Sequence, residues 1–148
     1  MESSRSPAWR LFLVSFLVLF LEVVLIRWVS TEIRVFAYIK NLPLLASFLG
    51  IGLGSLLATR RSVFKWGAVS LAILVALVAL SGPLQLTHLI FPGNNYAVWG
   101  ARAIVDGAYY AELAKFTFTI VGVTALIVLT FVALGQEMGR LMNLLPAL

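Results

Sequence analysis

The sequence places a carboxylate, Glu22, inside an apolar run that is long enough to cross a membrane. This run is followed by a cluster of charged residues between positions 27 and 40, and then by a second apolar segment that contains several glycines. A charged side chain at the centre of a bilayer costs about 2.5–3.5 kcal/mol on insertion scales. We therefore expect Glu22 to be neutralised or paired inside a bundle of helices.

The composition predicts an integral membrane protein. Of the 148 residues, 61% are hydrophobic and 11% are charged, whereas a soluble domain is about 45–50% apolar and about 25% charged. A core of this size cannot hide so much apolar surface, so we expect one transmembrane domain over residues 1–148 that contacts the lipid bilayer. The net charge of +5 is then explained by basic residues that flank membrane segments, and it does not indicate nucleic-acid binding.

The apolar segments predict an all-α bundle of about four transmembrane helices. Gly82-Pro83 interrupts the third segment and predicts a break in that helix. The first segment is longer than the apolar region of a signal peptide and lacks an Ala-x-Ala-like site, so we expect it to be retained as a signal anchor. The four segments are expected at about 9–28, 42–58, 66–90 and 116–133, the last continuing as a helix to Arg140.

The four apolar segments predict a multi-pass membrane protein, and the basic residues predict that both of its termini lie in the cytoplasm. Four spans place both termini on one side, and the connections 27–41 and 91–115 on the other, where we expect interfacial amphipathic segments. The side with the termini carries Arg5, Arg10, Arg60, Arg61, Lys65 and Arg140. The opposite side carries Arg27, Arg34, Lys40, Arg102 and Lys115.

Two interpretations of Glu22 remain open. In the first, Glu22 belongs to a buried pair that fixes the packing of the helices. In the second, it is a site for a proton or a cationic amine inside the bundle. Arg27 is a second charge in the same helix, but five residues away it does not share a face with Glu22. We favour the structural interpretation.

Gly50 and Gly54 predict a surface for close contact between helices. Together with Ala58 they form a face of small residues at four-residue spacing. The same glycines are a poor match to a dinucleotide-binding loop, because the third position of G-x-G-x-x-G falls on Ser55 and no strand precedes it.

His88 is the only histidine and therefore the one candidate for cofactor binding. A haem or a chlorophyll-type pigment is an open alternative there, although an interfacial polar residue is the commoner role. The chain has no cysteine, which excludes thiolate metal sites and cysteine nucleophiles. Since no catalytic constellation is recognisable, we expect a protein that is not an enzyme and has no cofactor or metal.

Two stretches resemble a known family. LEVVLIRWVSTEIRVFAYIKNLPLLASFLGIGLG (21–54) resembles the N-terminal membrane region of bacterial spermidine synthase-like fusion proteins, and ALGQEMGRLMNLLPAL (133–148) resembles their Gly-Gln-x-x-Gly-Arg segment. In that family a membrane domain of several helices is joined to a soluble, aminopropyltransferase-like domain. The polyamine-binding residues lie in the soluble domain, so none carries over to these 148 residues. The resemblance implies a membrane module, in the bacterial inner membrane, and not aminopropyl transfer.

These observations lead to one expected function and two alternatives. We expect a non-enzymatic membrane subunit that packs with other membrane protein subunits in a larger complex. The first alternative is a transport or amine-handling module, which Glu22 and the Gly82-Pro83 break would serve. The second is an accessory subunit of a photosynthetic or respiratory complex, for which His88 and the aromatic content are the only indications.

Overall fold

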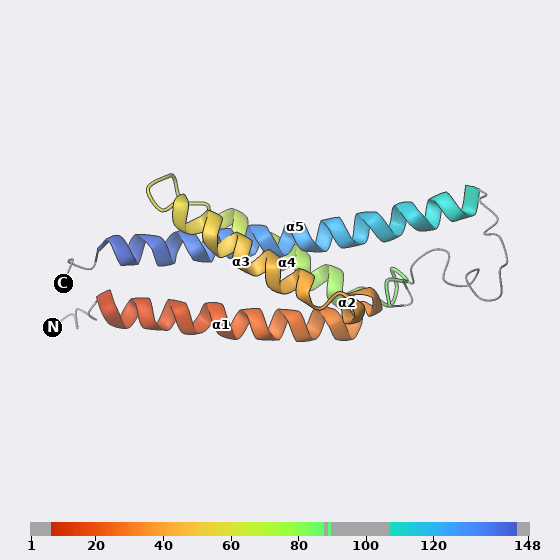
Figure 1. The fold of residues 1–148 in the computed structure, drawn as a ribbon, viewed down its shortest axis with the longest axis horizontal. Helices are drawn as coiled ribbons and strands as arrows, with labels where there is room; N and C mark the ends of the chain where they lie inside the picture. Colours follow the sequence, from red (N-terminus) through yellow and green to blue (C-terminus); the bar gives the residue numbers. More distant parts are fainter. Residues whose placement is uncertain (1–6, 88, 90–106, 145–148) are drawn as a thin grey trace.

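The chain forms a bundle of helices. The structure is a computed structural model that describes residues 7–87, 89 and 107–144, and these residues contain helices and no strand, as the all-α prediction requires. The helices are α1 (Pro7–Glu32), α2 (Arg34–Tyr38), α3 (Asn41–Leu56), α4 (Phe64–Ala79) and α5 (Gly107–Asn143) (Figure 1).

Two of the helices are long and apolar enough to cross a membrane, namely Trp9–Glu32 within α1 and Tyr109–Asn143 within α5. The apolar helices α3 and α4 have 16 residues each. At a rise of about 1.5 Å per residue they reach about 24 Å, which is less than the roughly 30 Å of a hydrocarbon core. Of the four predicted spans, two are therefore helices long enough to cross the hydrocarbon core, and the other two, α3 and α4, are shorter than its thickness.

The predicted break in the third segment appears as the end of a helix. The α4 helix stops at Ala79, before Gly82-Pro83, and the chain continues in turns. Gln85 there has a positive φ of 55°, in the left-handed region that a non-glycine residue seldom adopts. The end of that segment and most of the predicted connection 91–115 lie outside the described residues, while 107–115 form the first turns of α5.

The helices lie roughly along a common direction. In Figure 1, α1 and α5 run antiparallel, and α3 and α4 form a hairpin against the C-terminal half of α5. The start of α1 and the end of α5 lie at the same end of the bundle, next to the loop that joins α3 to α4. The α2 helix is a short link between α1 and α3.

Glycines bring α3 and α5 into close contact. A Cβ atom on Gly50 would lie 2.6 Å from the carbonyl oxygen of Val128, and one on Gly139 would lie 2.9 Å from the Cβ of Ala58. The predicted contact residues Gly50, Gly54 and Ala58 are all buried. Real Cβ atoms do not approach other atoms so closely, so the two backbones meet at this distance only because side chains are absent.

The remaining glycines of this contact lie on α5 and α4. A Cβ on Gly135 would lie 2.8 Å from the Cα of Ile51, and a Cβ on Gly67 of α4 would meet the Cβ of Ala133. The C-terminal half of α5 therefore packs closely against both helices of the α3–α4 hairpin.

Gly52 and Gly54 form a matched pair for testing this contact. A Cβ on Gly52 would have no neighbour within 4 Å, whereas a Cβ on Gly54 would lie 2.7 Å from the backbone nitrogen of Gln136. Gly54→Ala should destabilise the bundle by about 1–3 kcal/mol through overpacking. Gly52→Ala should leave stability unchanged or raise it by up to about 1 kcal/mol, because alanine favours the helix. Thermal unfolding in detergent followed by circular dichroism measures both, and equal effects would contradict the packing described.

Candidate functional site

A cluster of polar contacts ties the end of α5 to the loop between α3 and α4. We call this cluster the loop latch; it consists of Gln136 and Arg140 of α5 and the loop 57–63. Gln136 is fully buried. Its amide nitrogen donates to the carbonyl oxygens of Leu57 at 2.8 Å and Arg61 at 3.0 Å, with a longer contact of 3.4 Å to that of Arg60. Its Oε1 accepts from the backbone N–H of Val63 at 2.8 Å.

These hydrogen bonds serve the ends of two helices. Leu57 is the C-cap of α3 and Val63 is the N-cap of α4. Helix ends leave backbone carbonyl and N–H groups without intrahelical partners, and an unpaired buried group is costly. A single amide side chain, which has both donors and an acceptor, satisfies groups at both ends of the hairpin loop.

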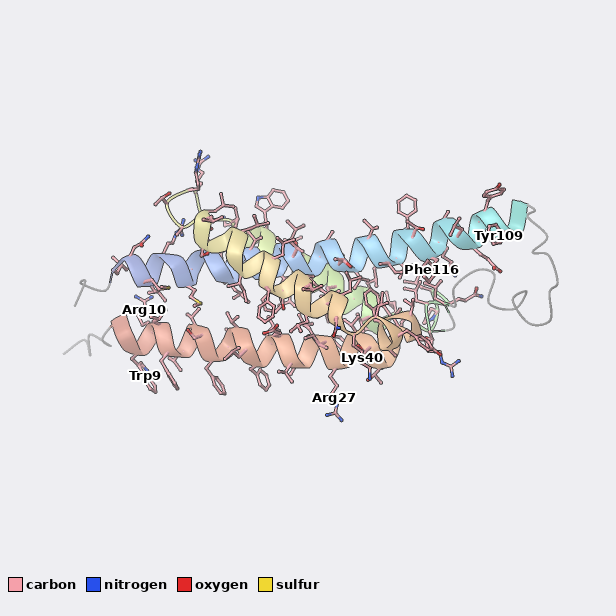
Figure 2. All side chains as sticks on the ribbon, viewed as in Figure 1. Trp9, Arg10, Arg27, Lys40, Tyr109 and Phe116 are labelled. Carbon is pink, nitrogen blue, oxygen red and sulfur yellow. The ribbon has the colours of Figure 1, made fainter. Side chains whose placement is uncertain are left out.

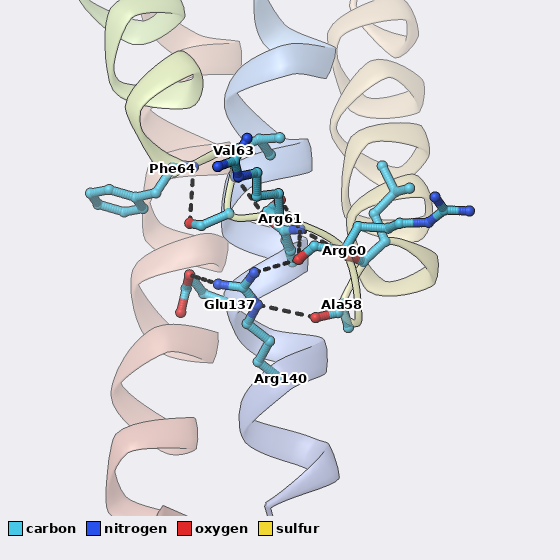
Figure 3. Close-up of polar contacts among 10 residues, drawn as sticks. Ala58, Arg60, Arg61, Val63, Phe64, Glu137 and Arg140 are labelled. Carbon is cyan, nitrogen blue, oxygen red and sulfur yellow. Dashed lines mark hydrogen bonds and ion pairs between the residues drawn. The ribbon is translucent and has the colours of Figure 1, made fainter.

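Arg140 adds the second part of the loop latch. Its Nε donates to the carbonyl oxygen of Ala58 at 3.1 Å, and its Nη2 donates to that of Arg60 at 2.7 Å (Figure 3). Its Nη1 pairs with the carboxylate of Glu137 at 3.1 Å, and both side chains are about one-third exposed. The guanidinium group is thus held by the loop on one side and by a carboxylate on the other.

The loop latch gives the Gly-Gln-x-x-Gly-Arg pattern a structural explanation. Gly135 and Gly139 allow α5 to approach α3, and Gln136 and Arg140 bind the loop beyond it. The acceptors in the loop are backbone carbonyl oxygens, which are neither nucleophiles nor proton-transfer groups. The arrangement is suited to holding a fold.

Glu22 forms a second buried polar contact, between α1 and α3. Its side chain is 5% exposed, and its Oε1 lies 2.6 Å from Oγ of Ser47. The same Oγ lies 2.8 Å from the carbonyl oxygen of Leu44. The hydroxyl of Ser47 is the donor in both contacts, so its single proton is shared between an oxygen of the Glu22 carboxyl group and the carbonyl oxygen of Leu44.

The structure does not bring the two predicted intramembrane charges together. Figure 2 shows Arg27 on the side of α1 that is turned away from the other helices, whereas Glu22 lies in the interior. The partner of Glu22 is therefore a hydroxyl group of α3. Ser47 is fully buried, but it is an ordinary serine in an apolar helix, and nothing in the sequence singles it out.

His88, the candidate cofactor ligand, lies outside the described residues. Among the residues that the structure does describe, no group of three or more histidine, aspartate or glutamate side chains is placed to hold a metal ion.

Comparisons of the chain with protein-family models, with curated proteins and with solved structures found no match. The resemblance to spermidine synthase-like fusion proteins accordingly stays a prediction.

Removing the amide of the loop latch should destabilise the bundle strongly. Gln136→Ala deletes three short hydrogen bonds and leaves the N–H of Val63 and two carbonyl groups without these partners, which should cost about 2–4 kcal/mol. Asn143→Ala, at the exposed last residue of α5, is the matched control and should change stability little. Thermal unfolding of both variants in detergent measures the difference, and a Gln136→Ala variant as stable as the control would contradict the latch.

Proposed function

We propose that this chain is a non-enzymatic integral membrane protein that packs as a subunit in a larger membrane complex. Its buried polar groups support a structural role, because Gln136 binds the hairpin loop and Glu22 binds Ser47. The membrane module implied by the spermidine synthase-like resemblance is compatible with this role.

The division of α5 into two halves carries this proposal. With 37 residues, α5 is about 55 Å long at 1.5 Å per residue. Its C-terminal half, from Val123, has buried residues throughout, whereas every position from 107 to 122 whose burial is described is exposed or half-buried. In Figure 1 this N-terminal half extends beyond α3. Phe118 is 80% exposed and Val121 is 61% exposed, so this half presents an apolar surface of the kind on which a partner subunit packs.

The outer face of α1 supports membrane embedding. Phe12, Phe16, Phe20 and Val23 follow one another at helical spacing, and each is more than half exposed. Trp9 lies on the same side of α1, turned away from the other helices (Figure 2). A continuous apolar stripe of this length is suited to lipid and unsuited to water.

The end of the bundle that holds the termini is the end we assign to the cytoplasm of a bacterial cell. It brings together Arg10, Arg140 and three basic residues of the α3–α4 connection, at positions 60, 61 and 65. Among the described residues the opposite end carries four, at positions 27, 34, 40 and 115. An excess of lysine and arginine favours the cytoplasmic side.

The transport or amine-handling alternative depends on a free carboxylate at Glu22. Ser47 lies within hydrogen-bonding distance of that carboxyl group, and the contact joins two helices of the bundle. The contact favours a role for Glu22 in helix packing over a role in binding a ligand, and it therefore favours the subunit proposal over the transport alternative.

Exposed residues of the N-terminal half of α5 should be needed for assembly and not for folding. Purified in mild detergent from its native membrane, the chain should elute with stoichiometric partner subunits. The double variant Phe118→Ala with Val121→Ala should elute alone with an unchanged melting temperature, because neither side chain is buried. The control Leu45→Ala with Phe48→Ala, on exposed positions of α3, should stay in the assembly. A wild-type chain recovered as a stable monomer would contradict the proposal.

A further inference from the structure

Two adjoining cavities form a groove between α1 and the α4–α5 pair, which we call the α1 groove. The outer cavity has a volume of about 450 Å³ and the inner one about 240 Å³. Both are lined by Leu17 of α1, Phe64 of α4 and Leu134 of α5, so they share a wall of three side chains.

Each long helix contributes one face to the groove. On α1 the lining residues Arg10, Val14, Leu17 and Leu21 follow a four-three-four spacing, which places them in one row along the helix. This row is next to the buried row that contains Val18 and Glu22, so α1 contacts the bundle along one row and leaves a gap along the other.

The opposite wall belongs to α5 and has the same spacing. Thr130, Leu134, Glu137 and Leu141 form a single row that runs antiparallel to the row on α1. Leu141 and Glu137 therefore lie at the end near Arg10, and Thr130 lies at the inner end. Gly67, Ala68 and Ala133 also line the inner cavity.

The groove has a polar mouth and an apolar interior. Arg10, Ser62 and Glu137 line the outer cavity, whereas Thr130 is the only residue with a polar side chain along the inner one. Glu137 is already paired with Arg140 at 3.1 Å. Arg10 is exposed, lies on the side of α1 that faces α5, and forms no ion pair with the described residues (Figure 2). The mouth therefore offers a cation to an anionic group.

The length of the groove matches one leaflet of a bilayer. Arg10 and Leu21 are eleven positions apart, which is about 16 Å along a helix, and half of a hydrocarbon core is about 15 Å. The acyl chain of a lipid that enters the groove beside Arg10 would reach the middle of the membrane at Leu21.

We propose that the α1 groove binds one acyl chain of an anionic phospholipid, with the headgroup phosphate held by Arg10. This rests on the proposed membrane location. The guanidinium group supplies charge complementarity to the phosphate, and Ser62 supplies a hydroxyl donor at the same mouth. The apolar rows of α1 and α5 supply the surface for the chain.

The test uses the full chain in vesicles of equal parts phosphatidylglycerol and phosphatidylcholine, followed by native mass spectrometry of the lipid it retains. The wild-type chain should retain phosphatidylglycerol in preference to phosphatidylcholine. Arg10→Gln should lower that retention about fivefold, which corresponds to about 1 kcal/mol for one arginine near an anionic headgroup. Arg27→Gln, which removes an exposed arginine from α1 outside the groove, should change nothing.

A second variant tests the interior. Ala68→Leu places a larger side chain in the inner cavity and should lower retention of both lipids, whereas Ala76→Leu, at an exposed position of α4 outside the cavities, should not. Equal retention by Ala68→Leu and the wild type, or equal effects of Arg10→Gln and Arg27→Gln, would overturn the proposal. A protein that requires detergent for extraction and yet carries no lipid would also overturn the lipid proposal, but it would not contradict the proposed role as a membrane subunit. A chain released from membranes without detergent would overturn both.

Discussion

The close approach of α3 to α5 is the constraint on which the rest of the bundle depends. Gly50 and Gly54 of α3 lie against the backbone of α5, and Gly135 of α5 lies against Ile51 of α3, at distances that leave no room for a Cβ atom. This contact places Gln136 directly beneath the α3–α4 loop, where its amide satisfies the backbone at both helix ends. Without the glycines the amide would not reach the loop, so backbone contact and polar contact stabilise the same arrangement.

The position of α1 follows from two contacts with this unit. The Glu22–Ser47 contact joins the middle of α1 to α3, and beyond it Val29, Ile33 and Phe36 are fully buried. Toward its N-terminus α1 instead borders the cavities lined by Val14 and other apolar residues. A helix fixed at its middle and one end, and separated from its neighbours at the other, provides a space that lipid can fill.

Some of this was predictable from the sequence. Composition determines the helical class, because only helices and closed barrels satisfy their backbone groups in lipid. The four-residue spacing of Gly50 and Gly54 marks a contact face, and Gly82-Pro83 marks the end of a helix. The residue or segment that each of these features contacts was not predictable. Ser47 is one of several serines, and no local pattern indicates that it meets Glu22, 25 positions away. Two helix ends were also predicted wrongly. Apolar residues continue past the end of α4, and α5 begins before its apolar stretch does.

The most direct test of the close α3–α5 contact is a cysteine cross-link, which the chain suits because it contains no native cysteine. A Cβ on Gly139 would lie 2.9 Å from that of Ala58, closer than the roughly 3.5–4.5 Å that a disulfide spans, so a small outward shift of α5 brings the pair into range. A Cβ on Gly52, by contrast, has no neighbour within 4 Å. After mild oxidation in native membranes, the Ala58→Cys, Gly139→Cys variant should lose both thiols to an intramolecular disulfide and resist alkylation by a maleimide. The Gly52→Cys, Gly139→Cys variant should keep both thiols reactive. Full alkylation of the first pair would contradict the contact on which this structure depends.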